Sequence, residues 1–329
     1  MAKQKDFDTF LRNIEPSKTT VQYVSSVQNS LRDYLRQHKT YSNVHKETFL
    51  SGSYAKHTSI RPTKEDNKRD VDIIVVTTHS QDDDSSKVLQ ELYDVLVASS
   101  TYRSATIQHH SVGIELSQLS IDVVPVIVDK DDDSLYWIAD SEDGTWTNSD
   151  PKGHKNWSTE TNQNNNNNYK PLVKIFKWWR RKHCPGGVKY PKGITLEKLI
   201  ADNLGDSSAS TEDFLIETMQ NIVSAYKKAY VDAGINPYID DPSGKIDSND
   251  LLAGYTTDDF KGFILKLDEH IKLLNDNGSE SETWRTILGT EFPKNQESKS
   301  LYNLLACKTA FHRQKSAWPM ARGSAVIVT

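Results

Sequence analysis

The chain has 329 residues, 36% of them hydrophobic and seven of them tryptophan, which is enough for two domains or one elaborated domain with a substantial core. The formal net charge of −5 and the pI near 6.1 exclude the global basic bias of proteins that coat nucleic acid. Long nucleic acid is therefore not expected as the main partner.

The only two cysteines, Cys184 and Cys307, are far apart and lack CxxC spacing. Neither a disulfide framework nor a structural zinc site is indicated, and a reducing compartment fits best. The N-terminal segment lacks the apolar region of a signal peptide, and no window approaches the roughly 20 apolar residues that cross a bilayer. We expect a cytoplasmic protein without a membrane partner.

The first elements in chain order are a helix, a strand and a turn. Apolar residues at helical spacing predict a long amphipathic helix from Ser17 to about Gln37, with Ser17 or Thr19 as N-cap. A short strand is expected over Glu47–Leu50. The pair Gly52-Ser53 then turns the chain into a short helix that should end near Pro62, before a charged, exposed loop over residues 63–69.

Two apolar, β-branched runs follow, "VDIIVVTT" at 71–78 and "QLSIDVVPVIV" at 118–128, and both predict strands. Pro125 suggests that the second strand lies at a sheet edge or carries a bulge. Between them we expect a helix over Ser86–Val97 and one or two strands within residues 104–117. This order describes a small mixed sheet with helices against it.

The second half of the chain is predicted to be largely helical. The polar stretch after Trp146 ends in the asparagine run Asn164–Asn168, which is interpreted as a loop or a loose helix entry. A strong amphipathic helix follows in "YKPLVKIFKWWRRKH", residues 169–183, and another begins near Thr195. Further helices are expected over 210–231, 257–275 and 281–288.

Two aspartates at the start of the first apolar strand are the strongest candidates for chemistry. Residues two apart in a strand project to the same face, so Asp70 and Asp72 point together. Two carboxylates aimed at one point repel unless a cation lies between them, and Mg²⁺ prefers oxygen ligands. Asp122, an acid among Ile121, Val123 and Val124, completes a two-cation site if its strand pairs beside the first.

The two-aspartate pattern alone is a weak signal, because aspartates near strand starts usually belong to turns. The combination is much rarer. Gly52-Ser53 precedes a helix whose N-terminal amides, together with the serine hydroxyl, can hold phosphate, and the paired aspartates and then Asp122 follow in order.

These residues resemble a known signature. "FLSGSYAKHTSIRP", "RDVDIIVV" and "SIDVVPV" resemble the motifs of DNA-polymerase-β-like nucleotidyltransferases, and the subtype is similar to the cGAS/DncV-like nucleotidyltransferases (CD-NTases) of bacterial CBASS anti-phage defence. The segment "KWWRRKHCPGGVKYPKGITLEKLI" resembles the following helices of that family, most closely its clade D. The resemblance covers roughly the first two-thirds of the chain.

The resemblance implies an α+β fold. Residues 1–165 would form the nucleotidyltransferase core, a mixed sheet with helices and an N-terminal helix. Residues 166–329 would form a C-terminal helical lobe, joined to the core by a long spine helix that carries the nucleotide-binding lysines. The nucleotide cleft would lie between the two lobes.

The resemblance also assigns roles to residues. It implies that a catalytic triad holds two Mg²⁺ ions, with Mn²⁺ as an alternative, and that five other residues bind nucleotide. Lys174 and Lys177, three residues apart on the spine helix, would neutralise the β- and γ-phosphates. The triad is Asp70, Asp72 and Asp122, and the nucleotide-binding set is Gly52, Ser53, Lys174, Lys177 and Thr195.

The implied reaction joins nucleoside triphosphates, ATP above all, with release of pyrophosphate at each step. The product would be a cyclic tri- or dinucleotide, with cyclic tri-AMP favoured. This second messenger would activate a separate effector, typically a nuclease, and an E1/E2-like partner would conjugate the C-terminal "RGSAVIVT" segment. Asp122 would accept or orient the hydroxyl proton.

Two other interpretations stay open. The first is a nucleotidyltransferase that adds a nucleotide to RNA or to a small acceptor, although an RNA acceptor favours a basic face, which the acidic balance does not indicate. A catalytically silent nucleotide-binding module is the second alternative, and the presence of all three aspartates argues against it.

Overall fold

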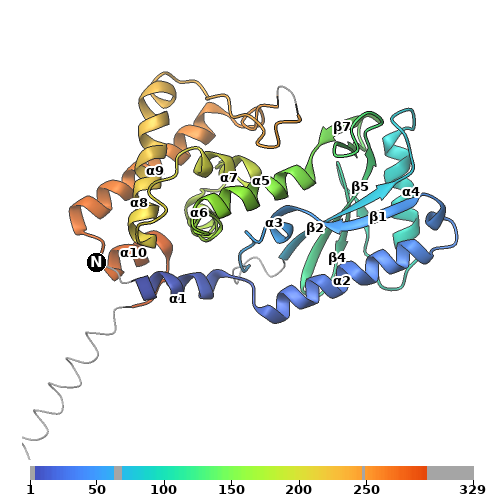
Figure 1. Ribbon diagram of the computed structural model, residues 1–329, viewed down its shortest axis with the longest axis horizontal. Coiled ribbons are helices and arrows are strands. Elements are labelled where there is room, and N and C mark those ends of the chain that lie inside the picture. Colours follow the sequence, from blue (N-terminus) through green and yellow to red (C-terminus); the bar gives the residue numbers. More distant parts are fainter. Residues whose placement is uncertain (1–3, 63–68, 247–248, 295–329) are drawn as a thin grey trace, which may run out of the picture.

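The computed structural model describes residues 4–62, 69–246 and 249–294. Residues 63–68 of the predicted exposed loop, Cys307 and the C-terminal "RGSAVIVT" segment lie outside these ranges. Arg69, the last residue predicted for that loop, begins β2 (Arg69–Thr77). Figure 1 shows a sheet-containing half and a helical half, with α6 (Tyr169–His183) beside the sheet-side helix α3 (Gly52–Ala55). Each half has its own main hydrophobic core.

A seven-stranded mixed sheet forms the first half. Its path is β1-β2-β5-β4-β3, and β6 pairs with β5 while β7 pairs with β6. The two strands that sequence analysis singled out, β2 and β5, run parallel and lie side by side. The bounds are β1 His45–Leu50, β2 Arg69–Thr77, β3 Thr106–Ile107, β4 Val112–Glu115, β5 Leu119–Val128, β6 Tyr136–Ala139 and β7 Trp146–Ser149.

The strand period of two decides which side chains reach the cleft. On β2, Val71, Ile73 and Val75 pack in one core with α2 (Lys18–Gln37) and α4 (Ser85–Val97). The alternate residues therefore face the other side of the sheet, where Ile74 and Val76 form a smaller cluster. Asp70 and Asp72 belong to this second face, as predicted.

The prediction that Pro125 marks an edge strand or a bulge is wrong, because β5 has partners on both sides. β2 pairs with β5 without a register shift on one side. On the other side β4 pairs as far as Val123, and β6 begins pairing at Val126. Val124 and Pro125 lie in the gap between β4 and β6, so no ladder hydrogen bond to a neighbour on that side is missed.

The predicted helices of the second half are present. α6 matches its predicted bounds, and the hydroxyl of Thr195 lies in the first turn of α7. The helix predicted over 210–231 consists of an α-helix followed by a π-helical turn. The bounds are α7 Gly193–Ala201, α8 Thr211–Tyr226, η2 Lys227–Val231, α9 Thr257–Asn277 and α10 Ser281–Leu288.

Within the described residues, two α-helices and the short 3-10 helix η1 (Tyr41–Asn43) escaped prediction, and one helix is shorter than predicted. α1 (Gln4–Ile14) packs Phe7 and Phe10 into the core of the helical half, although it precedes the sheet in sequence. α5 (Pro151–Asn164) is almost entirely polar and is capped by Asp150. The helix after Gly52 ends at Ala55 rather than near Pro62, because the backbone of His57 has a positive φ of 58°, which a right-handed helix does not accommodate.

Candidate active site

Three aspartates lie on the two adjacent strands β2 and β5. Asp72 on β2 and Asp122 on β5 are register partners in the parallel ladder, and Asp70 lies two residues before Asp72. Parallel neighbours are about 4.8 Å apart, so the carboxylates of Asp72 and Asp122 share one small region. The predicted pairing of the two strands is confirmed.

The electrostatics of this region favour a cation. Burial raises the pKa of Asp72, and the negative charges of Asp122 and Asp70 raise it further. Burial also raises the pKa of Asp122, against a hydrogen bond donated by the Ser111 hydroxyl at 3.4 Å. Both shifts arise mainly from desolvation, and the neighbouring carboxylates add to them. An all-oxygen donor set of neighbouring carboxylates fits a divalent ion such as Mg²⁺.

Gly52 lies directly against one of these carboxylates. A Cβ atom at this position would be 1.8 Å from the Oδ2 atom of Asp72, and the backbone φ of Gly52 is +58°. The amide of Ser51 also donates to the carbonyl of Asp72 at 2.9 Å. The turn therefore needs glycine for two reasons, a close approach and a left-handed backbone.

Asp70 and Asp72 line a cleft made of two adjoining pockets of about 570 and 370 Å³, whereas Asp122, the register partner of Asp72, lines neither pocket. Both pockets are lined by Ser53, Asp70, Lys177 and Gly193. The larger pocket adds Arg180, Arg181 and Lys192 to its wall, and the smaller adds Gly52, Asp72 and Lys155. The cleft thus places carboxylates from the sheet opposite cations from α6 and its neighbours.

A buried ion cluster forms the wall facing the aspartates. Glu197 of α7 is fully buried, and its carboxylate contacts the ammonium of Lys177 at 2.7 Å and that of Lys56 at 2.9 Å. The Thr58 hydroxyl donates to the same carboxylate at 3.0 Å. Burial alone would raise the pKa of Glu197, but Lys177 and Lys56 outweigh it and hold the pKa at about 2.

This cluster has two ammonium groups for one carboxylate. Lys177 is the spine-helix residue predicted to bind phosphate, and burial lowers its pKa while Glu197 raises it. Both lysines line the smaller pocket. The cluster therefore carries more positive than negative charge, and it lines the same pocket as the carboxylate of Asp72.

Two predicted nucleotide-binding residues lie elsewhere. Lys174 forms an ion pair with Glu15 at 2.7 Å, and the Thr195 hydroxyl donates to the Leu251 carbonyl at 3.1 Å. Neither residue lines either pocket. The structure therefore brings together Gly52, Ser53, Lys177 and the aspartates, but not these two side chains.

Sequence reasoning missed Lys56 and Glu197. The signal for Glu197 was present, because it is an acid among the apolar residues Leu196, Leu199 and Ile200, the same pattern that drew attention to Asp122. A buried acid needs a partner, but Lys56 lies 141 positions away in the chain (197 minus 56), and sequence spacing does not reveal such a contact.

Comparison with known proteins identifies the family of this chain. The model of the Second Messenger Oligonucleotide or Dinucleotide Synthetase domain matches residues 1–162. A curated Cyclic AMP-AMP-AMP synthase from an Acinetobacter species is 36% identical, with 91% of this chain and 88% of the relative covered. The chain belongs to the cGAS/DncV-like nucleotidyltransferases. This CD-NTase is also 26% identical to a Cyclic AMP-AMP-GMP synthase from Enterobacter hormaechei, over 89% of this chain and 92% of that protein.

Solved structures share the fold of this CD-NTase. Escherichia coli CdnC, determined with ATP, superposes with a TM-score of 0.67 at 20% identity, covering 89% of this chain and 99% of the other. The predicted family and the predicted α+β fold are confirmed, and so is the assignment as a nucleotidyltransferase. Within the described ranges, no helix combines the length and the apolar content needed to span a bilayer.

Proposed function

We propose that this CD-NTase joins ATP molecules into a cyclic oligonucleotide, with cyclic tri-AMP as the favoured product. The name of the Acinetobacter relative, at 36% identity over nearly the whole chain, supports this product. The Enterobacter relative, named for an AMP-AMP-GMP product, is less similar at 26%. Clade D, which the sequence motifs resemble, is part of the same proposal.

The observation that carries the proposal is the register of Asp72 with Asp122, with Gly52 closed against Asp72. The turn at Gly52 thus lies against the Asp72 carboxylate, beside the register partner Asp122. The opposite wall, with Lys177 and Lys56 around Glu197, has positive charge in excess. A metal-bound triphosphate has the complementary distribution, because its metal end is cationic and its far end anionic.

In the proposed reaction, a ribose hydroxyl attacks the α-phosphate of a triphosphate, and pyrophosphate leaves. Asp70, Asp72 and Asp122 would hold two Mg²⁺ ions, which when bound supply charge neutralisation for the attacking and leaving oxygens. Asp122 would accept or orient the hydroxyl proton. Ser53 and Lys177, which line both pockets, would hold the triphosphate.

Other predicted features also stay proposals. Lys174 would have to leave Glu15 to reach a phosphate, and Thr195 would have to turn from Leu251. We further propose that the enzyme acts in the bacterial cytoplasm, that its product activates a separate effector of nuclease type, and that an E1/E2-like protein conjugates its C-terminus. We retain the division into domains at residues 165 and 166, with α1 packing across it.

A product assay tests the proposed function. The full chain is incubated with the four NTPs and Mg²⁺, and the products are identified by mass spectrometry before and after phosphatase treatment. We expect a phosphatase-resistant cyclic product that contains AMP, formed with ATP alone. Asp122→Asn serves as the inactive control, and Asp133→Asn, in an exposed loop, as the matched active one.

Two outcomes would contradict the proposal. Products that form only when RNA is added would support a nucleotidyltransferase with an RNA acceptor. No pyrophosphate release with any combination of NTPs would support the silent nucleotide-binding module.

A further inference from the structure

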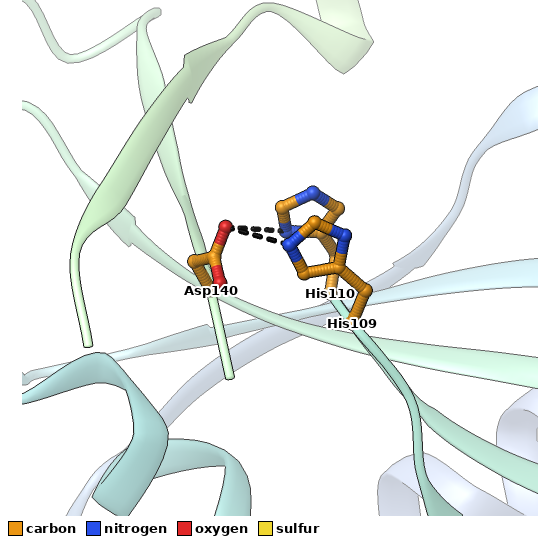
Figure 2. Close-up of side chains that lie close together, drawn as sticks. All are labelled: His109, His110 and Asp140. Atoms are coloured by element: carbon orange, nitrogen blue, oxygen red, sulfur yellow. Dashed lines mark hydrogen bonds and ion pairs between the residues drawn. The ribbon is translucent and has the colours of Figure 1, made fainter. Parts of the chain in front are cut away.

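A second group of metal-binding side chains lies at the gap between β4 and β6. His109 and His110 occupy the turn between β3 and β4, and Asp140 directly follows β6. Figure 2 shows the two imidazole rings side by side, with the carboxylate of Asp140 turned toward them. One ligand atom from each of these three residues lies within 4.8 Å of the others.

The position of this group in the sheet is specific. β4 and β6 both pair with the same side of β5, and they leave Val124 and Pro125 without a partner there. The amide of Ser141 donates to the carbonyl of His109 at 2.9 Å. Nδ1 of His110 donates to the carbonyl of Ala139 at 3.1 Å, a bond that must open before that nitrogen can bind an ion. The three side chains therefore join two hairpins that meet end to end.

The separations suit a single small cation. Nε2 of His109 is 2.9 Å from Oδ2 of Asp140, and Nδ1 of His110 is 3.9 Å from the same oxygen. Ligands about 2.0–2.2 Å from a tetrahedral zinc ion are roughly 3.3 Å from one another, between these two values. Glu142, whose Oε2 is 3.9 Å from Nε2 of His109, can supply a fourth ligand.

Two hydrogen bonds hold Asp140 in position. The Ser85 hydroxyl donates to its carbonyl at 2.6 Å, and the Glu142 amide donates to its Oδ1 at 2.8 Å. Its other carboxylate oxygen, Oδ2, is thereby aimed at the histidines. Such support of a ligand by its neighbours is typical of metal sites. His109 and His110 are 50% and 42% exposed, so an ion can enter from solvent.

The two rings stack, with their centroids 3.9 Å apart and an interplanar angle of 19°. Two histidines therefore share one carboxylate, that of Asp140. By contrast, the pair of His79 with Glu91 uses one histidine.

We propose that His109, His110 and Asp140 bind one Zn²⁺ ion, or a dication of similar preference, at a site separate from the three aspartates. Imidazole nitrogen favours zinc, copper or nickel over magnesium, whereas the all-carboxylate site favours magnesium. Each site therefore selects its own metal. The bound ion would fasten the β3–β4 turn to the end of β6 and brace β5, the strand that carries Asp122.

Calorimetry with Zn²⁺ tests the proposal on the untagged full chain, in excess Mg²⁺ to occupy the aspartates. We expect one Zn²⁺ per chain for the wild type and at least tenfold weaker binding for His109→Ala and for His110→Ala. His79→Ala, which removes a histidine paired with one carboxylate, is the matched control and should bind as the wild type does. Asp72→Asn should also keep the site.

Co²⁺ in place of Zn²⁺ gives a second readout, because its visible absorption reports nitrogen and oxygen ligands in a tetrahedral arrangement. Zn²⁺ should raise the melting temperature of the wild type and leave that of His109→Ala unchanged. Circular dichroism without metal checks that the variants fold. The proposal is overturned if the wild type binds no Zn²⁺ in excess Mg²⁺, or if the histidine variants bind it equally well.

Discussion

Asp72 and Glu197 line the same pocket, yet their pKa values shift in opposite directions. Burial raises the pKa of Asp72, and the neighbouring aspartates raise it further. Burial would also raise the pKa of Glu197, but two lysines reverse the effect. The difference shows that burial alone does not set the charge state of an acid. For Asp72, burial and the neighbouring carboxylates outweigh the attraction of Lys56, whereas Glu197 has two ammonium groups in direct contact.

The largest effect is expected from removing the Asp72 carboxylate. Asp72→Asn should lower pyrophosphate release by about 10⁴-fold, or about 5.5 kcal/mol, because the metal loses a ligand and its charge compensation. The same change should stabilise the metal-free protein at neutral pH. A raised folded-state pKa means that stability is greatest below the unfolded pKa and falls as pH rises through the folded one.

The measurement combines a pyrophosphate assay with urea denaturation in EDTA. Asp131→Asn, in an exposed loop, is the control and should change neither quantity. Unchanged turnover in Asp72→Asn would rule out the proposed metal site.

The second-largest effect is expected from removing the charge of Glu197, which contacts Lys177 and Lys56. Glu197→Gln should destabilise the protein by about 3–5 kcal/mol at neutral pH, because two buried ammonium groups lose their partner. In the wild type, the contribution of Glu197 is complete above its unfolded pKa near 4.5 and is lost as pH falls through about 2. Denaturation curves across this pH range check both statements.

Glu160→Gln, on the exposed side of α5, is the matched control for that experiment. Equal stability of Glu197→Gln and the wild type at neutral pH would mean that the two lysines do not depend on Glu197.

The third effect concerns the turn beside Asp72. Gly52→Ala should lower turnover by about 100-fold, or about 2.7 kcal/mol, because the new methyl group would displace the Asp72 carboxylate and strain a positive φ. Steady-state kinetics measure it. Gly186→Ala is the control, since a Cβ there meets nothing within 4 Å. Similar turnover for the two variants would contradict the close approach.

The smallest effect is stabilisation by Mg²⁺ itself. Saturating Mg²⁺ should raise the melting temperature of the wild type by about 2 °C, equivalent to about 1 kcal/mol. The shift should shrink at acidic pH, because the raised pKa of Asp72 lets protons compete with the metal. Differential scanning fluorimetry measures it. Asp72→Asn should lose the shift and Glu197→Gln should keep it. The opposite result would contradict the proposal that Asp72 binds Mg²⁺.

The sequence was informative where local periodicity sets the geometry. The period of two placed Asp70 and Asp72 on one face, and the apolar neighbours of Asp122 identified a third acid in a strand. The helix of residues 169–183 could be predicted from its apolar stripe. In each case the contact partner is a neighbouring residue or an entire hydrophobic face, so spacing is enough.

The sequence was less informative where contacts depend on distant segments. Lys174 and Lys177 lie three residues apart on α6, which leaves their side chains about 60° apart around the helix axis. The two ammonium groups therefore diverge, one toward Glu15 and the other toward Glu197. α5 escaped prediction because it lacks an apolar stripe and begins at a capping residue, Asp150.

The parallel register of β2 and β5 also affects how the protein acquires activity. Asp72 and Asp122 are 50 positions apart (122 minus 72), with α4 and two strands between them. Pairing across such a separation is slow, because the intervening chain must lose its freedom before the contact forms. During refolding, helix signals should recover before nucleotide chemistry does, and no short fragment around either aspartate should be active.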